Sequence, residues 1–423
     1  MAPTPFLAAA ETHRAGVTTL LRDLVHTPSL SSQERDVVAL LTGQMEALGY
    51  DEVILDPFGS VIGRVGSGST VIVMDSHIDT VGIGSRDEWS RDPFEPVLDD
   101  GVIYGRGACD DKGGMAAMVY GGALAKELGL VPDDVTLYVV GSVQEEDCDG
   151  LALEHVLTHC LPRPDVVVLG ESTNGQVYRG NRGRIEVLIR TRGTSCHASA
   201  PERGHNPVYD LSAVIADVEA LNGRLAFDDF LGAGSVALTK IECETPSLNA
   251  VPSTATLYLD RRLTVGEDPD AALREIAALP SVQRVGGQVE LVSYERTSFT
   301  GTTLGQDKRF RTWVVPEASR SVQAGLRTLE RALGRADAGT GRWVFSTNGV
   351  ASMGKLGIPT IGYGPGDERY AHTVAERCPV QDLVDAMAFY AAFPAEFAAS
   401  AADVDSESRG AASGAALSGA AGS

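Results

Sequence analysis

The sequence has too few basic residues to bind nucleic acid through charge. It contains 35 Lys and Arg against 57 Asp and Glu, which gives a net charge of -22 at pH 7. Because nucleic-acid phosphates require a cationic surface, this balance argues against that class of partner. Most of the carboxylates are expected to form a solvated, self-repelling surface. A minority could still bind a metal ion.

Cysteine pairs and long apolar runs are also missing. The six cysteines are scattered and show no CxxC spacing, so neither a thiolate zinc site nor a disulfide framework is expected. No run approaches the ~18 apolar residues of a membrane span. The N-terminal stretch MAPTPFLAAAETHRAG lacks the basic region of a signal peptide. These features predict a protein of the reducing cytoplasm without a membrane partner.

Apolar runs alternate with helical patterns in the first part of the chain. The runs at 70–74, 135–143 and 165–170 predict strands, and a helix is predicted over 112–129 between the first two. This alternation predicts an α/β fold with a parallel sheet covered by helices on both faces. Ser31 and Glu34 have the spacing of a capping box, which predicts a helix over 32–48.

The pattern changes after Asn181. The order of the next predicted elements is β-α-β-β-α-β, as in a ferredoxin-like module. A linker from Tyr294 to about Pro316 follows, and then the α/β pattern resumes. We therefore predict one α/β domain formed by residues 1–181 and 298–400, which is interrupted by a module at 182–297. Residues 401–423 are rich in Ala, Gly and Ser and predict a disordered tail.

Ionisable side chains follow three of the predicted strands. The first run leads into His77 and Asp79, the second into Glu145 and Glu146, and the third into Glu171. In an open parallel sheet, ligands bind at the carboxyl ends of the strands. If these strands are neighbours, their ionisable side chains should therefore converge on one crevice.

Two glycine-rich loops add further candidates. GRGACDDKGG (105–114) contributes Asp110 and Asp111, and YGPGDERYAH (363–372) contributes His372. Each cluster alone is usually a solvated turn or a satisfied core pair, but their coincidence indicates a metal centre. Carboxylates crowded together need neutralisation. A mixed set of His and carboxylate ligands suits zinc, with manganese or cobalt as alternatives.

Taken in this order, the motifs resemble those of the co-catalytic zinc amidohydrolase and peptidase family of acetylornithine deacetylase, succinyl-diaminopimelate desuccinylase, aminoacylase and glutamate carboxypeptidase. The resemblance covers about residues 10–400 and rests on DSHIDT, GRGACDDKGG, QEED, LGEST, TSCHASAP, NAVPSTATLYLDRR and AHTVAE. DPF, DGVIYGRG and NRGRIE are most similar to a subgroup labelled selenium-metabolism-linked hydrolases. The resemblance implies a metal-binding catalytic domain and an inserted lid module that forms a homodimer.

The resemblance also implies a role for each matching residue in the catalytic domain. Two divalent metal ions, zinc first, would be bound by His77, Asp110, Glu146, Glu171 and His372. Asp110 would bridge the ions, and a cis peptide would join it to Asp111. Asp79 would orient His77, and Glu145 would be the general base on a metal-bridging water. Asp111 stands where many relatives have an apolar residue.

Residues of the inserted module would complete the site. His197 in TSCHASAP would reach across a dimer into the partner's active site and help to stabilise the oxyanion. Asn249 and Arg262 match substrate-contacting positions, and Arg262 would hold a substrate carboxylate through a bidentate contact. The stretch STNG at 346–349 differs from the Thr-Asp-Ala pattern of the glutamate carboxypeptidases.

The predicted function is metal-dependent hydrolysis of an amide bond in an N-acyl amino acid or small peptide. Two metal ions lower the pKa of a shared water and polarise the scissile carbonyl, while Glu145 takes the proton. One alternative is a ureido or carbamoyl amidohydrolase of the same fold, and another is a non-catalytic metal-binding relative. The presence of Glu145 beside all five expected ligands argues against the non-catalytic alternative.

Overall fold

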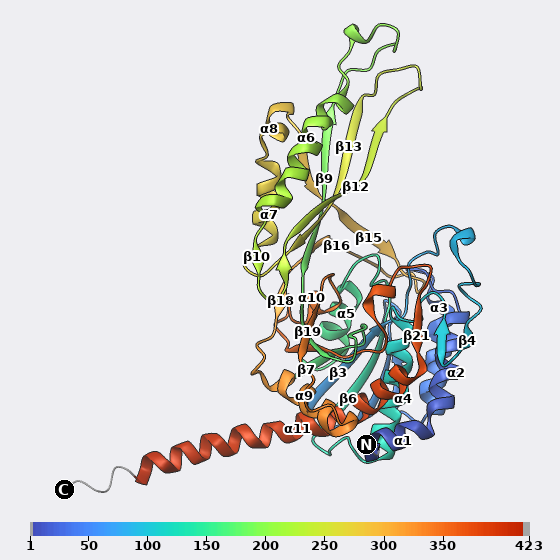
Figure 1. The fold of residues 1–423 in the computed structure, drawn as a ribbon, viewed down its shortest axis with the longest axis vertical. Helices are drawn as coiled ribbons and strands as arrows, with labels where there is room; N and C mark the ends of the chain where they lie inside the picture. Colours follow the sequence, from blue (N-terminus) through green and yellow to red (C-terminus); the bar gives the residue numbers. More distant parts are fainter. Residues whose placement is uncertain (1–2, 418–423) are drawn as a thin grey trace, which may run out of the picture.

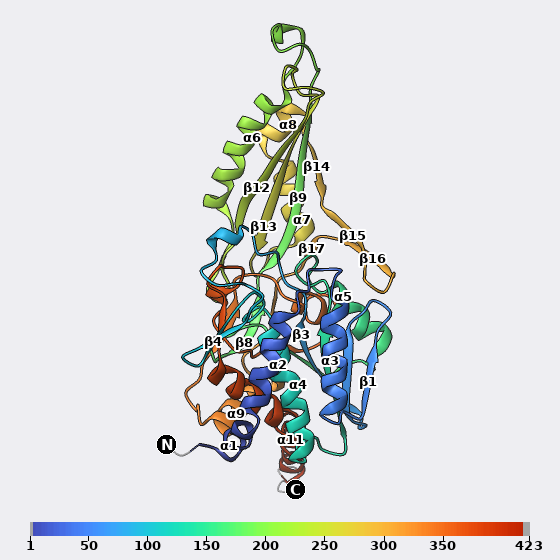
Figure 2. The same ribbon diagram turned by 90° about the vertical axis from the view of Figure 1, so that its right-hand side faces the viewer.

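Two β-sheets, each with its own hydrophobic core, lie one beyond the other along the long axis of the molecule (Figure 1; turned by 90° in Figure 2). The structure is a computed structural model that describes residues 3–417, with side chains for residues 3–400. The larger sheet belongs to an α/β body built from the first and last parts of the described chain. The smaller sheet belongs to an elongated module formed by the middle of the chain.

The larger sheet has nine strands within the described residues. In spatial order they are β1 (Glu52–Leu55), β2 (Val61–Gly66), β6 (Val135–Ser142), β3 (Thr70–His77), β7 (Val166–Leu169), β20 (Thr360–Gly362), β8 (Val177–Asn181) and β18 (Trp313–Val314), with β19 (Thr340–Trp343) also paired to β8. Strands β6, β3, β7 and β20 are parallel. The predicted parallel sheet is thus confirmed at its centre. Its outer pairs include antiparallel ones such as β1–β2, because a short connection can join antiparallel but not parallel neighbours.

Helices surround this sheet. They are α1 (Pro5–Thr12), α2 (Arg14–His26), α3 (Arg35–Ala47), α4 (Lys112–Glu127), α5 (Leu151–His155), α9 (Arg320–Leu333), α10 (Gly349–Ser352) and α11 (Val380–Leu417). Helix α4 packs on β3 and β6, and α11 packs against α4 and α9. The buried faces of sheet and helices form a continuous apolar core. This core fixes the ends of the central strands, where the candidate site lies.

The inserted module contains a five-stranded antiparallel sheet. In spatial order the strands are β12 (Ser235–Glu244), β13 (Thr254–Leu263), β9 (Gly183–Arg192) and β14 (Gln288–Leu291), with β17 (Arg309–Phe310) also paired to β9. Helices α6 (Pro207–Leu221), α7 (Pro269–Ala277) and α8 (Pro280–Val285) accompany it, as does the small hairpin β10 (Phe227–Asp228) and β11 (Gly232–Ala233). The chain order is the predicted β-α-β-β-α-β.

The segment predicted to be a linker, from Tyr294 to about Pro316, is structured. It forms the hairpin β15 (Ser293–Thr297) and β16 (Thr303–Asp307) and then β17 and β18. The strands SYERT and TLGQD are short and mostly polar, so they lack the apolar signal of a core strand. Strand β17 also adds to the module's sheet beyond the predicted boundary at residue 297. The division into a catalytic and a lid domain stays a prediction.

The connection between module and body is a pair of adjacent chain segments. Strand β8 leads directly into β9, and β17 leads into β18 on the return. Phe310 pairs with Arg184 on the module side, and Trp313 pairs with Asn181 on the body side. The chain therefore crosses between the two parts as a two-stranded antiparallel ribbon.

A small third sheet joins two loops that are distant in sequence. It contains β4 (Val97–Asp99), β5 (Val102–Tyr104) and β21 (Arg377–Pro379), in the order β21-β5-β4. Cys378 pairs with Ile103. The segment that follows the loop of His372 is thereby held beside the strand that leads into the loop of Asp110.

Helix α11 continues to Leu417 and projects from the body in Figure 1. This differs from the disordered tail predicted over 401–423, since the backbone is helical as far as 417. Alanine has the highest helix propensity of all residues, which fits a helix in this Ala-rich segment. Residues 418–423 lie outside the described part of the chain. None of the described helices, α11 included, is both long and apolar enough to cross a membrane.

Candidate metal centre

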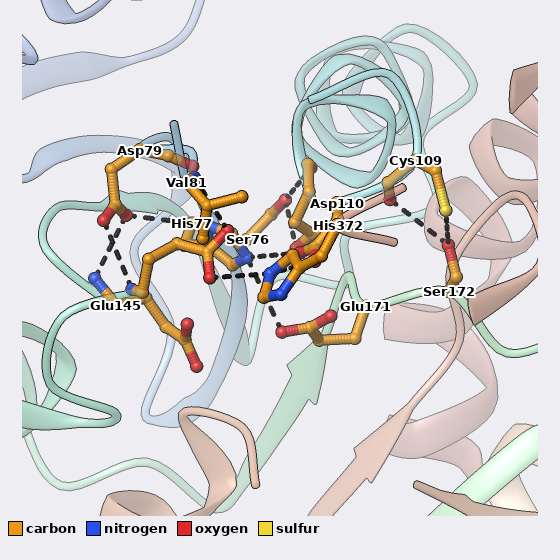
Figure 3. A network of polar contacts seen from close by, with 12 residues as sticks. Ser76, His77, Asp79, Val81, Cys109, Asp110, Glu145, Glu171, Ser172 and His372 are labelled. Atoms are coloured by element: carbon orange, nitrogen blue, oxygen red, sulfur yellow. Dashed lines mark hydrogen bonds and ion pairs between the residues drawn. The ribbon is translucent and has the colours of Figure 1, made fainter. Parts of the chain in front are cut away.

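The five predicted metal ligands meet in one cluster, and Figure 3 labels four of them: His77, Asp110, Glu171 and His372. His77 Nε2 lies 2.8 Å from Asp110 Oδ1 and 3.7 Å from Glu171 Oε1. His372 Nε2 lies 3.1 Å from Asp110 Oδ2 and 2.9 Å from Glu146 Oε2. Asp110 thus presents one carboxylate oxygen to each histidine, and its role as a bridge between two metal ions stays a prediction.

The parallel strands bring most of these residues together. His77 is the last residue of β3, Glu171 follows the end of β7, and Glu146 lies in the turn after β6. These strand ends are neighbours, because β3 lies between β6 and β7. His372 comes from the loop after β20, where its φ of 61° places it in the left-handed region. The rule that sites form at the carboxyl ends of parallel strands therefore located the cluster correctly.

Asp110 is supported by an acid that the sequence analysis did not assign. Glu376 Oε1 accepts the backbone N–H groups of Cys109 and Asp110, each at 3.1 Å. Its other oxygen pairs with Arg106. The Asp110–Asp111 peptide is cis, as the resemblance implied. Glu376 is the last residue of AHTVAE, so its place beside His372 in that motif was the available signal.

Asp79 touches both His77 and the turn that follows β6. Its backbone carbonyl lies 3.0 Å from His77 Nδ1, and its Oδ1 lies 3.5 Å from the same nitrogen. Its carboxylate accepts the N–H groups of Glu145 at 3.0 Å and Glu146 at 3.2 Å. Figure 3 shows this carboxylate turned toward the backbone of the turn. Such contacts are typical of a residue that orients a metal ligand.

The predicted capping box of Ser31 and Glu34 is wrong. Helix α3 begins at Arg35, and the Ser31 hydroxyl donates to Asp79 Oδ2 at 2.6 Å. The Glu34 carboxylate accepts the N–H groups of Ser32 and Gln144. A tertiary contact with the candidate site has replaced the local contact that the spacing suggested.

Asp111 is the additional acid of the cluster. It is 1% exposed, and Ser76 donates to its Oδ2 at 2.7 Å. Its donor atom lies within 4.8 Å of those of His77 and Glu171. Burial raises the pKa of Asp111 well above its usual value, while the nearby His77 lowers it in part. Asp111 therefore lies on the buried side of the cluster, beside His77 and Glu171.

The protonation of the cluster reflects the crowding of acids around two histidines. Burial, and then the charge of Asp110, raises the pKa of Glu171 and of Glu146. Hydrogen bonds with Asp110 and Glu146 raise the pKa of His372 to about 11. Protons on these groups offset negative charge that a bound cation would otherwise neutralise. Imidazole and carboxylate donors around a shared Asp110 fit a divalent metal centre.

A cavity of about 240 Å³ opens onto the cluster and is lined by Glu145, Phe345, Arg262 and His372, among others. Glu145 is 6% exposed, and burial raises the pKa of its carboxyl well above its usual value. Arg262 pairs with Asp260 at 2.6 Å and donates toward Ser346 Oγ at 3.4 Å. The predicted base and the predicted substrate-binding arginine therefore share one cavity.

His197 and Asn249 are not in this cavity. His197 pairs with Ala250, and the Ala198 N–H donates to the Asn249 carbonyl at 2.8 Å, so His197 and Asn249 lie near each other. The loops that carry them, between β9 and α6 and between β12 and β13, form the far end of the module in Figure 1. Within one chain, the structure therefore separates these two residues from the metal ligands.

The fold is a mainly parallel sheet covered by helices, with a cluster of imidazole and carboxylate groups and a buried glutamate at its strand ends. This combination is typical of a metal-dependent hydrolase. The chain belongs to peptidase family M20/M25/M40, which matches residues 73–396. The family resemblance noted in the sequence is thus confirmed. The narrower selenium-linked subgroup stays a prediction.

Two relatives cover almost the whole chain. The uncharacterized protein YgeY of Escherichia coli K12 is 44% identical over 388 residues, which cover 92% of this chain and 96% of the relative. Succinyl-diaminopimelate desuccinylase of Gluconacetobacter diazotrophicus is 30% identical over 397 residues, which cover 89% of this chain and 95% of the relative.

Solved structures show the same fold at lower identity. The M20 family metallo-carboxypeptidase Sso-CP2 from Sulfolobus solfataricus matches with a TM-score of 0.69 at 19% identity, covering 90% of this chain and 99% of that one. The dipeptidase Dug1p from Saccharomyces cerevisiae matches with a TM-score of 0.71 at 15% identity, covering 93% and 98%. These matches support the mixed α/β fold.

Proposed function

We propose that the protein hydrolyses an amide bond in an N-acyl amino acid or small peptide that carries a carboxylate. The observation that carries this proposal is the arrangement around Asp110, whose two oxygens face different histidines. His77 and Glu171 would complete one metal site, and His372 and Glu146 the other. Zinc fits these nitrogen and oxygen donors best, with manganese or cobalt as alternatives.

The two ions would polarise the scissile carbonyl and make water a better nucleophile at neutral pH. Glu145 would act as the general base. Its carboxylate lines the cavity and is aimed by a turn whose N–H groups are fixed by Asp79. It would take a proton from the attacking water as the new carbon–oxygen bond forms. It would then pass that proton to the nitrogen as the carbon–nitrogen bond breaks.

Arg262 would select substrates that carry a carboxylate. Its guanidinium reaches the same cavity as Glu145 and is now balanced by Asp260. A substrate carboxylate could share the guanidinium, since Arg offers several donors in one plane. The size of the cavity, about 240 Å³, suits a small substrate.

His197 and Asn249 would come from a second copy of the chain. They lie together at the far end of the module, and β12 forms an exposed edge of its sheet. Pairing of two modules would cover these edges. We therefore propose a homodimer in which each module supplies these two residues to its partner's cavity. All six cysteines are free, which fits the reducing cytoplasm that we propose as its compartment.

The test is a substrate screen with metal-replete protein, with amine release as the readout. N-acyl amino acids, dipeptides and ureido acids form its three arms. Hydrolysis in either of the first two arms, lost with a chelator and restored by zinc or manganese, would support the proposal. Activity on ureido acids alone would point to the alternative amidohydrolase chemistry. Metal binding without turnover in any arm would point to a non-catalytic relative.

A further inference from the structure

Two buried acidic side chains, Asp79 and Glu34, bind the backbone of the turn that carries Glu145 and Glu146. Asp79 accepts the N–H groups of Glu145 at 3.0 Å and Glu146 at 3.2 Å. Glu34 Oε1 accepts the N–H of Gln144 at 3.1 Å. Three consecutive backbone donors are thus bound to acids that do not line the substrate cavity.

The backbone conformation explains why these donors need acceptors on the same side of the turn. Gln144 has a φ of 56°, in the left-handed region, at the start of the turn. A turn that combines left-handed and right-handed residues directs successive N–H groups into one concavity, which binds anions. The side chains of Glu145 and Glu146 then extend away from that concavity, toward the metal centre. The orientation of base and ligand therefore depends on what fills the concavity.

Glu34 is itself fixed by the loop before α3. Its side chain is fully buried, and Oε1 also accepts the Ser32 N–H at 2.9 Å. The loop is joined to the end of β3, because the Thr80 N–H donates to the Ser29 carbonyl at 2.9 Å. The Ser31 hydroxyl reaches Asp79 from the same loop. Residues 29–34 therefore form a preassembled support for the turn.

We propose that Glu34 is a positioning residue for catalysis, which aims Glu145 and Glu146 through the N–H of Gln144. This inference rests on the proposed hydrolytic function. Without an acceptor at this place, the Gln144 N–H would be buried and unpaired, and the turn would relax to satisfy it. A displacement of ~1 Å in a catalytic group can lower turnover by about 10²-fold.

The test compares three substitutions of Glu34. Glu34→Gln keeps an acceptor oxygen at the same distance, so its turnover should stay within about 3-fold of the parent protein. Glu34→Asp shortens the side chain by one methylene and so moves the acceptor away from the Gln144 N–H. Its kcat should lie between those of the other two variants. Glu34→Ala removes it and should lower kcat by about 10- to 100-fold while KM changes little. The matched control is Glu396→Gln on α11, where a buried acid pairs with Arg331 of α9, away from the site.

Two readouts separate positioning from general stability. A positioning role predicts that kcat falls in the order Glu34→Gln, Glu34→Asp, Glu34→Ala. This order should hold even if the control loses as much thermal stability as the Glu34 variants do. Wild-type kcat in Glu34→Ala, or an equal loss of kcat in the control, would overturn the proposal. Failure of all three variants to fold would also overturn it, by showing a purely structural residue.

Zinc affinity distinguishes this inference from the proposed function. Glu146 lies in the same turn, so Glu34→Ala should weaken zinc retention in competition with a chelator, whether or not a substrate is known. If the parent protein hydrolyses nothing but Glu34→Ala still loses zinc affinity, the proposed reaction fails and the support of the turn stands. If the parent is active and Glu34→Ala matches it in both readouts, only this inference fails.

Discussion

His372 Nε2 lies 2.9 Å from Glu146 Oε2, although the two residues are 226 positions apart in the sequence. The His372 side chain is 53% exposed, whereas that of His77, on the other side of Asp110, is 1% exposed. The two halves of the cluster therefore differ in their access to solvent. Metal ions bound in them should differ in how readily they are lost.

The first prediction is that removal of either histidine affects metal content differently. His372→Ala should lose about one metal ion per chain on dialysis, because His77, Asp110 and Glu171 remain. His77→Ala should lose more, since it leaves Asp110 and Glu171 buried without their imidazole. Metal analysis of the dialysed proteins measures the difference. His205→Ala, at an exposed histidine paired with Asp210 in the module, is the control and should keep both ions.

Glu145→Gln and Glu146→Gln should separate chemistry from metal binding. Glu145→Gln should retain metal and lower turnover by ~10²-fold or more, the usual scale for a general base. Glu146→Gln should lower metal occupancy, because it weakens a ligand of the half-exposed site. Metal analysis and amine release are measured on the same samples. Equal metal contents in the two variants would show that the roles are wrongly divided.

The stability of the protein should carry a pH-dependent contribution from Glu34. Burial, and then the charge of Asp79, raises the pKa of Glu34 to about 8 in the folded protein. The unfolded value is ~4.3, so the folded state binds more protons between these two values. The stabilising contribution is therefore complete below pH ~4.3 and is lost as the pH rises through about 8.

Glu34→Gln cannot titrate and does not show this loss. Thermal melts of the parent protein and this variant, from about pH 5 to about pH 8, should show the variant gaining relative stability as the pH rises. A difference in melting temperature that stays constant over this range would contradict the pKa assigned to Glu34.

Arg262→Ala should weaken binding of substrates that carry a carboxylate. KM should rise by about 10-fold or more, the scale of a hydrogen bond to a charged group, while kcat changes less. The matched control is the carboxamide analogue of the same substrate, which lacks the negative charge. Steady-state kinetics with both compounds gives the comparison. An equal effect on the two compounds would exclude carboxylate recognition by Arg262.

Two inactive variants should complement each other if the site is shared between subunits. His197→Ala and Glu145→Gln, mixed under conditions that allow subunit exchange, would form some dimers with one intact site. Partial recovery of activity is the expected result, up to about half of the parent value within each mixed dimer. Exchange is verified with differently tagged chains. Proven exchange without recovery would contradict the shared site.

The sequence predicted which residues meet in the cluster because each one follows a strong local signal. His77, Glu146 and Glu171 come after apolar strands, and a parallel sheet brings such strand ends together. Asp110 and His372 lie in glycine-rich loops within motifs that are shared with the family. A local pattern together with one topological rule was therefore sufficient to bring these five residues together.

The supporting residues could not be assigned in the same way. Glu34 and Ser31 have a spacing that equally suits a helix cap, and only the tertiary fold shows that they reach Gln144 and Asp79. Glu376 lies near His372 in the motif AHTVAE, but the motif does not show its contacts with backbone N–H groups 267 and 266 positions away. The β15–β16 hairpin was missed because its strands pair with each other and bury few apolar side chains.

The ribbon between body and module limits how the two parts can move. Its segments are joined by backbone pairing at Arg184–Phe310 and Asn181–Trp313, and by the Gly183 N–H donating to Thr312 Oγ1 at 3.0 Å. Such a ribbon bends readily out of its plane but resists bending within it, because in-plane bending would stretch one row of bonded backbone. A hinge of this kind would favour rotation of the module along one arc. Arg262 on β13 is the backbone register partner of Arg184 on β9, so it belongs to the part of the module next to the ribbon. It would move along that arc relative to His372 when the module rotates. Opening and closing would thereby set the width of the substrate cavity.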